Sequence, residues 1–197
     1  MNLPWLPMLS SSGRCPAEPM LNKELLEQQL SELPLFQYAF VSSDELFFTP
    51  RVRHVCREEC DMYGKSWACP PAVGSVEECQ SKCLSFPELL MISTVTEVSD
   101  IANMEETLST RGDHEEITHQ ITELIRAQGC ETMTLSTEAC AICEKCSYPD
   151  GPCRHPDRMF PCVESHGILV TDLCEKHGME FFNGNIVTWV SLILFRS

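Results

Sequence analysis

The spacing of the cysteines constrains this chain more than any other feature. Thirteen cysteines occur in 197 residues, and eleven of them fall into two segments. The first segment contains Cys56, Cys60, Cys69, Cys79 and Cys83. The second contains Cys140, Cys143, Cys146, Cys153, Cys162 and Cys174. Each segment offers at least four thiols, the number that one tetrahedral metal ion or one four-iron cluster binds. The sequence therefore predicts metal binding.

A secreted, disulfide-rich protein is the alternative explanation for so many cysteines. The N-terminal residues contain no Lys or Arg before Arg14, and Pro4 and Pro7 interrupt them. They lack the basic start and the apolar core of a secretory signal peptide. We therefore expect reduced thiols in a cytoplasmic protein.

The charge and the hydropathy of the chain argue against two kinds of partner. A net charge of −15 does not suit a phosphate backbone, which requires clustered Lys and Arg. The longest apolar run, residues 186–195, is shorter than the roughly 20 residues that a membrane helix needs. We expect neither a nucleic-acid nor a membrane partner.

The pattern of the remaining residues predicts the domain organisation. Residues 1–19 are proline-rich and aperiodic and suggest a flexible N-terminal tail, followed by a single cysteine-rich metal-binding domain over 20–197. Leucines at helical spacing predict a helix over 20–33, and β-branched and aromatic residues predict four strands over 36–41, 88–98, 132–135 and 186–195.

Two more helices are expected between these strands. Asp113 and Glu116 suggest a capping box for a helix that Gly129 ends, and another helix is predicted over 164–177. The predicted fold is α+β, with a roughly four-stranded sheet, helices on one face and two cysteine-rich metal-binding loops outside the sheet.

The second cysteine segment has the more specific spacing. Cys140, Cys143 and Cys146 follow each other at three-residue steps, as do three ligands of a four-iron cluster in bacterial ferredoxins. Cys153 follows a turn over 149–152 and is the candidate for the fourth ligand. Zinc is the alternative metal, although zinc sites usually separate two CxxC pairs by a longer span.

The first cysteine segment offers five thiols for four places. Cys56 and Cys60 are spaced for one face of a helical turn, and Cys69 is followed by two prolines. Ser75 and Glu78 predict a capping box, so that Cys79 and Cys83 share one face of the helix that follows. Cys56, Cys60 and Cys69 are expected ligands, and either Cys79 or Cys83 is surplus, unless the site is something other than a simple four-iron cluster.

Read together, the two segments resemble a family of predicted metal-binding proteins of anaerobic bacteria and archaea, the domain of unknown function 2284. The resemblance runs from roughly residue 20 to the C-terminus and implies metal binding in an anaerobic cytoplasm, without an established reaction. It also implies that Cys79, rather than Cys83, is the helix cysteine of the family. The matching residues are Cys56-x3-Cys60, Tyr63-Gly64, Trp67-Ala68-Cys69-Pro70-Pro71, Glu78-Cys79, Cys140-x2-Cys143-x2-Cys146, Pro152-Cys153-Arg154, Pro156, Glu164 and Gly167-Ile168.

Other potential ligands have competing explanations. His114 and His119 lie five residues apart on one predicted helix, cannot share a metal, and are expected to face solvent. Cys174 and His177 could share zinc or could simply end an amphipathic helix. Cys162 is either an extra ligand or a small buried residue.

The function expected from the sequence is electron transfer in an anaerobic redox system. Two [4Fe–4S] clusters would be held by Cys56, Cys60, Cys69 and Cys79 and by Cys140, Cys143, Cys146 and Cys153, and a protein would be the redox partner. The alternatives are a zinc-binding structural or interaction protein and a small cluster-dependent reductase.

Overall fold

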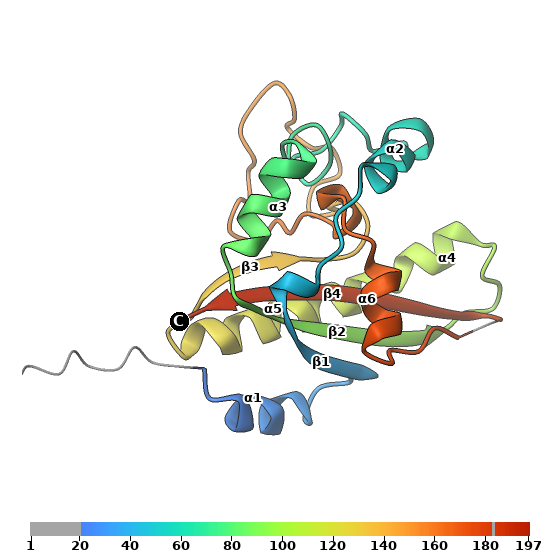
Figure 1. The fold of residues 1–197 in the computed structure, drawn as a ribbon. Helices are drawn as coiled ribbons and strands as arrows, with labels where there is room; N and C mark the ends of the chain where they lie inside the picture. The colour runs from blue at the N-terminus through green and yellow to red at the C-terminus, as the bar shows by residue number, and fades with distance from the viewer. Residues whose placement is uncertain (1–20, 183) are drawn as a thin grey trace, which may run out of the picture.

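The computed structural model describes residues 21–182 and 184–197, so the predicted tail over 1–19 lies outside the described residues. Figure 1 shows the arrangement of the elements. In chain order they are α1 (Lys23–Leu30), β1 (Gln37–Ser42), η1 (Ser43–Glu45), α2 (Pro50–Glu59), α3 (Val76–Leu84), β2 (Glu88–Glu97), α4 (Met104–Ser109), α5 (Arg111–Ala127), β3 (Glu131–Leu135), η2 (Glu164–His166), α6 (Val170–Lys176) and β4 (Ile186–Arg196).

The four predicted strands form one antiparallel sheet in the order β1-β2-β4-β3. The two longest strands, β2 and β4, lie at its centre, where Leu90 is opposite Ile193. Both are rich in β-branched and aliphatic residues, which pack well on a pleated surface covered on both sides. The α+β fold with a four-stranded sheet is confirmed.

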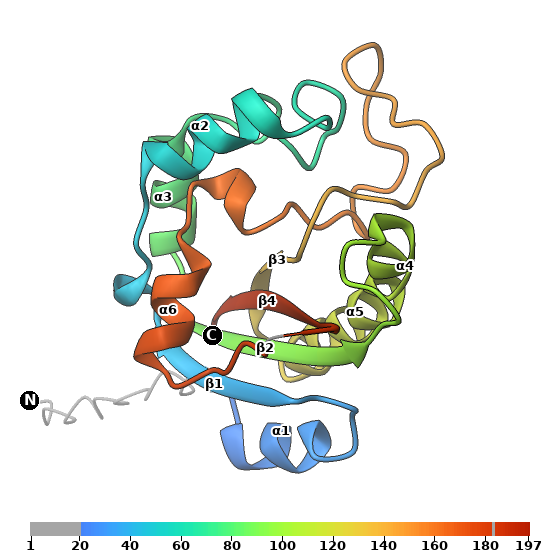
Figure 2. The same ribbon diagram turned by 90° about the vertical axis from the view of Figure 1, so that its right-hand side faces the viewer.

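Alternate residues of the central strands serve two separate cores, one on each face of the sheet. Leu90 and Ile92 pack under α1 and α5, together with Leu26 and Ile121. Leu89 and Met91 face the other way, toward the side that carries α3 and α6. Figure 2 shows α1 beneath the sheet, with α2, α3 and α6 above it. The helices on one face that the sequence predicts are joined by a second layer on the opposite face.

Several local boundaries differ from the expected ones. Helix α5 starts at Arg111, after Thr110, so Asp113 and Glu116 lie inside it and the expected capping box does not form. The expected helix over 164–177 is divided into η2 and α6 at Gly167, whose φ of 77° is left-handed. The capping box of Ser75 and Glu78 at the start of α3 is confirmed.

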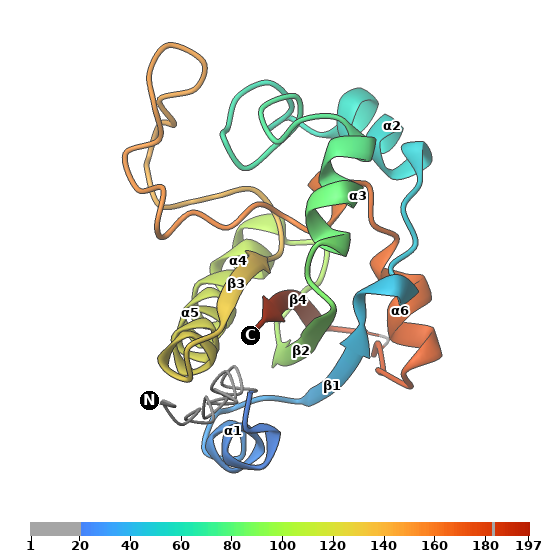
Figure 3. The same ribbon diagram turned by 60° about the vertical axis from the view of Figure 1, so that its left-hand side comes forward.

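Both cysteine-rich segments lie at the same end of the molecule, away from α1. Figure 3 shows the irregular segment between β3 and η2 beside the segment that joins α2 to α3. This places them on the α3 and α6 side of the sheet, where only Cys83 and Cys174 among their described cysteines belong to a core cluster. Within the described ranges, no helix is both long and apolar enough to cross a membrane.

Candidate metal centre

Four thiols of the second segment surround one small cavity. Cys140, Cys143, Cys146 and Cys153 line a space of about 20 Å³, closed on one side by Ser66 and Trp67 of the first segment. All four cysteines are half-buried. The structure therefore brings together the four residues that the sequence predicts for this site.

Hydrogen bonds give residues 140–154 their shape, since these residues form no helix or strand. The predicted turn is present, with the Gly151 amide donating to the Ser147 carbonyl at 2.9 Å and the Ser147 hydroxyl donating to Pro152 O at 2.6 Å. Arg154 donates to the carbonyl of Lys145 at 2.6 Å. This hydrogen bond connects the cysteine run to the residues that follow the turn. The charge of Arg154 lies beside the cavity.

Cys146 has the most thiolate-stabilising surroundings of the set. Burial raises its pKa, but the amides of Tyr148 and Trp67, the hydroxyl of Ser66 and the amide of Ser147 outweigh burial, and the pKa falls below its usual range. Donors directed at sulfur stabilise the charged form, which is the form that binds metal. Burial raises the pKa of Cys140, because the low-polarity surroundings disfavour its thiolate.

Three predicted ligands of the first segment line a larger cavity. This larger space is called the first cavity, and the small space of the second segment is called the second cavity. Cys56 on α2, Cys60 at the end of that helix and Cys69 line a space of about 670 Å³. Cys60 is exposed and its backbone is extended, with φ −97° and ψ 121°, so Cys56 and Cys60 do not follow one helical face as expected. Cys162 lines the same cavity.

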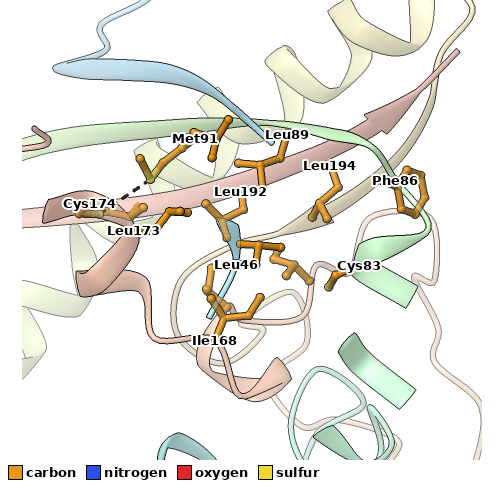
Figure 4. Packing of buried hydrophobic residues seen from close by; sticks show 14 of the residues in the cluster. Leu46, Cys83, Phe86, Leu89, Met91, Ile168, Leu173, Cys174, Leu192 and Leu194 are labelled. Atoms are coloured by element: carbon orange, nitrogen blue, oxygen red, sulfur yellow. Dashed lines mark hydrogen bonds between the residues drawn. The ribbon is translucent and has the colours of Figure 1, made fainter. Parts of the chain in front are cut away.

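The remaining cysteines of the described residues are buried. Cys79 and Cys83 are fully buried on the inner face of α3, which confirms their shared face. Cys83 belongs to the core above the sheet, and so does Cys174, whose Sγ lies 3.9 Å from Met91 Sδ (Figure 4). His177 instead contacts Glu45, 3.1 Å away, which favours the helix-end explanation of the Cys174 and His177 pair. Cys130 is buried in the core beneath the sheet.

A buried polar network anchors the start of the second segment. The Ser136 hydroxyl donates to Glu115 Oε2 at 2.6 Å, and Arg111 binds both that carboxylate at 3.2 Å and the Thr137 carbonyl at 3.0 Å. His114 lies next to this network, and its Nε2 atom is 2.7 Å from the Ser191 hydroxyl. The prediction that His114 faces solvent is wrong: it is 1% exposed, because it shares the inner face of α5 with Ile117 and Ile121.

The donor chemistry of both cavities fits a thiolate-binding metal or cluster, since sulfur from cysteine is the ligand that zinc and iron–sulfur clusters accept. Among the described residues, no three His, Cys, Asp or Glu side chains converge closely enough to hold a metal ion. Metal binding would therefore have to draw the thiols inward, which couples it to the folding of the two segments.

These features define a cysteine-rich α+β protein with two thiol-lined cavities. The chain belongs to the family described as predicted metal-binding protein (DUF2284), whose model matches residues 39–195. That match covers both cysteine segments and all four strands except the first two residues of β1 and the last residue of β4. No curated protein and no solved structure matched the chain significantly.

Sequence analysis gave no role in the site to three residues that line the cavities, although Trp67 and Glu164 match the family pattern. Trp67 and Ser66 form part of the wall of the second cavity although they belong to the first segment. Glu164 lines the first cavity beside Cys162, and its pKa is raised because it is buried. The contacts join residues about 80 to 100 positions apart, so the spacing of residues along the chain carries no signal for them.

Proposed function

We propose that this protein carries two iron–sulfur clusters and transfers electrons to or from a protein partner in an anaerobic redox system. The observation that carries the proposal is the single cavity lined by Cys140, Cys143, Cys146 and Cys153. These four thiols have the number and spacing that a [4Fe–4S] cluster uses. The first site would be held by Cys56, Cys60 and Cys69 with a further thiolate.

The residues around the second cavity suit a redox cluster. When bound, such a cluster supplies a one-electron carrier whose potential depends on charge and on hydrogen bonds to sulfur. The amides of Tyr148 and Trp67 are placed to donate to Cys146, and Arg154 adds positive charge at the same cavity. Both features stabilise the reduced, more negative state and raise the potential.

The closeness of the two cavities supports the proposal that electrons pass between them. Trp67 contacts the second segment through Gly151, while Cys69, two residues further on, lines the first cavity. The charge of Cys140 is close enough to Cys69 to contribute to raising the pKa of that thiol, after burial, Cys60 and Cys56. Two clusters bound here would be neighbours in one electron path.

Anaerobic purification of the full chain tests the proposal. We expect a brown protein with about eight irons and a similar amount of sulfide per chain. Cys143→Ser should remove about half of the iron because it removes one ligand of one cluster. Cys130→Ala is the matched control, since Cys130 lies in the core beneath the sheet, and it should keep all of the iron.

Zinc is the second candidate, favoured by the small size of the second cavity. About 20 Å³ is close to the volume that one water molecule needs, so a single ion fits with less rearrangement than a cluster does. Four cysteine thiolates are also a common structural zinc site. A colourless preparation from iron-replete anaerobic cells, with stoichiometric zinc that survives air, would replace the iron–sulfur proposal with a structural one.

A further inference from the structure

Cys162 shares the first cavity with the three thiols that the sequence predicts there. Cys56, Cys60, Cys69 and Cys162 all line the space of about 670 Å³, whereas Cys79 is not among its lining residues. Cys162 lies more than 90 residues beyond Cys69 in the sequence, so only the fold brings it to this place. The cavity therefore offers four thiols without Cys79.

The backbone around Cys162 is held firmly at this position. Ser136 and Cys162 form a parallel β-bridge, in which the Ser136 amide donates to Pro161 O at 2.8 Å and the Val163 amide donates to Ser136 O at 2.9 Å. The bridge continues the edge of β3 toward the cavity. Cys162 is thereby fixed to the sheet rather than to the irregular part of the second segment.

Contacts between α2 and η2 bring Cys56 to the same place. Cys56 Sγ lies 3.9 Å from the Glu164 carbonyl, and Arg53 donates to Ser165 O at 2.5 Å and to the carbonyl of Gly74. Arg53 thus joins α2, η2 and the loop before α3 at one point. These contacts place the thiols of α2 beside the residues that follow Cys162.

One hydrogen bond at Cys162 suits a metal-bound sulfur. The Ser165 amide donates to Cys162 Sγ at 3.2 Å, the kind of hydrogen bond that supports a metal-bound sulfur. Burial raises the pKa of Cys162, with further increases from Glu164 and Cys69 nearby. The support for Cys162 as a ligand is its hydrogen bond and the position of its sulfur at the cavity, not its acidity.

Cys79 faces a different environment. It is fully buried on α3, and its Sγ is directed at the Val73 carbonyl, 3.5 Å away. Its neighbour on the same helix face, Cys83, lies in the core above the sheet. Moving Cys79 into the first cavity would require α3 to shift against that core.

We propose that Cys162, and not Cys79, provides the fourth thiolate of the first metal site, with Cys56, Cys60 and Cys69. The proposal rests on the proposed metal-binding function and assigns one ligand of it. It also changes the arrangement of the sites: the first is shared between both cysteine segments, so the first segment cannot complete its site alone.

Metal analysis of single variants of the full chain tests this assignment. Cys162→Ala, Cys79→Ala and the control Cys83→Ala would be purified anaerobically, and iron, zinc and sulfide per chain would be measured with the electron paramagnetic resonance spectrum and circular dichroism. Cys162→Ala should lose about half of the metal, the share of one of two sites. Cys79→Ala and Cys83→Ala should keep the wild-type metal content and spectrum.

Two results would overturn the assignment: full metal content in Cys162→Ala, or equal or greater loss in Cys79→Ala. If Cys162→Ala is insoluble, Cys162→Ser is measured instead, since it keeps a polar atom of similar size. Metal loss or a changed resonance spectrum in that variant supports the proposal, and a wild-type spectrum with full metal content refutes it. A wild-type chain that binds no metal would refute the proposed function itself.

Discussion

The indole N–H of Trp67 donates to the carbonyl of Gly151 at 3.0 Å, and the Trp67 ring meets the Tyr148 ring edge-on with centroids 4.9 Å apart. Trp67 belongs to the first cysteine segment, whereas Gly151 and Tyr148 form the turn of the second. One aromatic side chain therefore joins two segments that lie 84 residues apart in the sequence.

Trp67→Phe should loosen the second segment. The change removes the hydrogen bond to Gly151, worth about 0.5–1.5 kcal/mol, and leaves much of the ring contact. We expect metal release from the Cys140 to Cys153 site to become about two- to tenfold faster, the same free energy expressed as a rate. Stopped-flow transfer of metal to a chelator measures this.

Trp189→Phe is the matched control for that experiment. Trp189 also donates its indole N–H, at 2.9 Å to the Thr110 hydroxyl, but it lies in a small cluster with Val98 and Val187, apart from the cysteine cavities. Equal acceleration of release in both variants would mean that general destabilisation, and not the contact between the segments, controls metal retention.

Cys146 should be the fastest cysteine to alkylate among those whose pKa is shifted. Its pKa is lowered, while burial raises the pKa of Cys69 to about 11 and that of Cys83 to about 12. A lower pKa gives a larger thiolate fraction at neutral pH, and the thiolate is the reactive form. Iodoacetamide labelling of metal-free protein, read by peptide mass spectrometry, gives the order of modification.

Ser66→Ala tests the cause of that reactivity. The variant removes one donor to Cys146, so alkylation of Cys146 should slow while Cys69 remains slow. Labelling of Cys83 before Cys146 in folded protein would contradict the burial and hydrogen bonding described for these thiols.

The stability of the fold should fall on acidification because His114 is buried as a neutral ring. Burial, followed by the charge of Arg111, lowers its pKa from 6.5 to about 3. Between those two values the unfolded chain binds the proton and the folded chain does not, so the free energy of unfolding decreases as the pH falls through that range. Urea unfolding at a series of pH values measures the slope.

His166 contributes in the same direction over a narrower range, because burial lowers its pKa from 6.5 to about 4. His114→Gln should flatten the pH dependence of unfolding down to about 3, and His166→Gln only down to about 4. An unchanged slope in both variants would show that other groups control the acid response.

Gly167→Ala should destabilise the protein more than Gly178→Ala does. Both glycines have left-handed backbone, with φ of 77° and 65°, and an alanine costs about 1–2 kcal/mol in that conformation. A Cβ at residue 167 would also lie 3.1 Å from Val76 and 3.3 Å from the Thr49 carbonyl, whereas nothing lies within 4 Å at residue 178.

The crowding at residue 167 adds a further cost of about 1–3 kcal/mol, typical of an overpacked site. Thermal unfolding followed by circular dichroism compares the two variants directly. A smaller loss of stability in Gly167→Ala than in Gly178→Ala would refute the close packing of η2 against the start of α3.

The sheet was predictable from the sequence because its strands carry strong local signals. Strands β2 and β4 are long runs of β-branched and aliphatic residues, and their expected bounds differ from the observed ones by one residue at most. Helix α2 has no such signal: its sequence, PRVRHVCREE, has no buried residues. Its position depends on Thr49 at the N-cap and on Arg53 bonding to η2, which are a local and a tertiary contact respectively.

The two thiol sets differ in the same way. The set from Cys140 to Cys153 was predictable because fourteen consecutive residues contain all four thiols. The surroundings of Cys162 depend on its pairing with Ser136, which residue spacing cannot reveal. His114 did have a signal, since it continues the helical series of Ile117, Ile121 and Ile125 toward the N-terminus, but a histidine at such a position was expected to face water.

The β-bridge between Ser136 and Cys162 closes the second segment at its base. Part of the entropy lost in closing the second segment is therefore lost when the sheet folds, and metal binding has only to draw together the thiols of each cavity. By linkage, whatever favours the closed base also favours the bound metal. Substitutions in the sheet core, away from the thiols that line the two cavities, should then first become evident as metal deficiency in protein that is still folded.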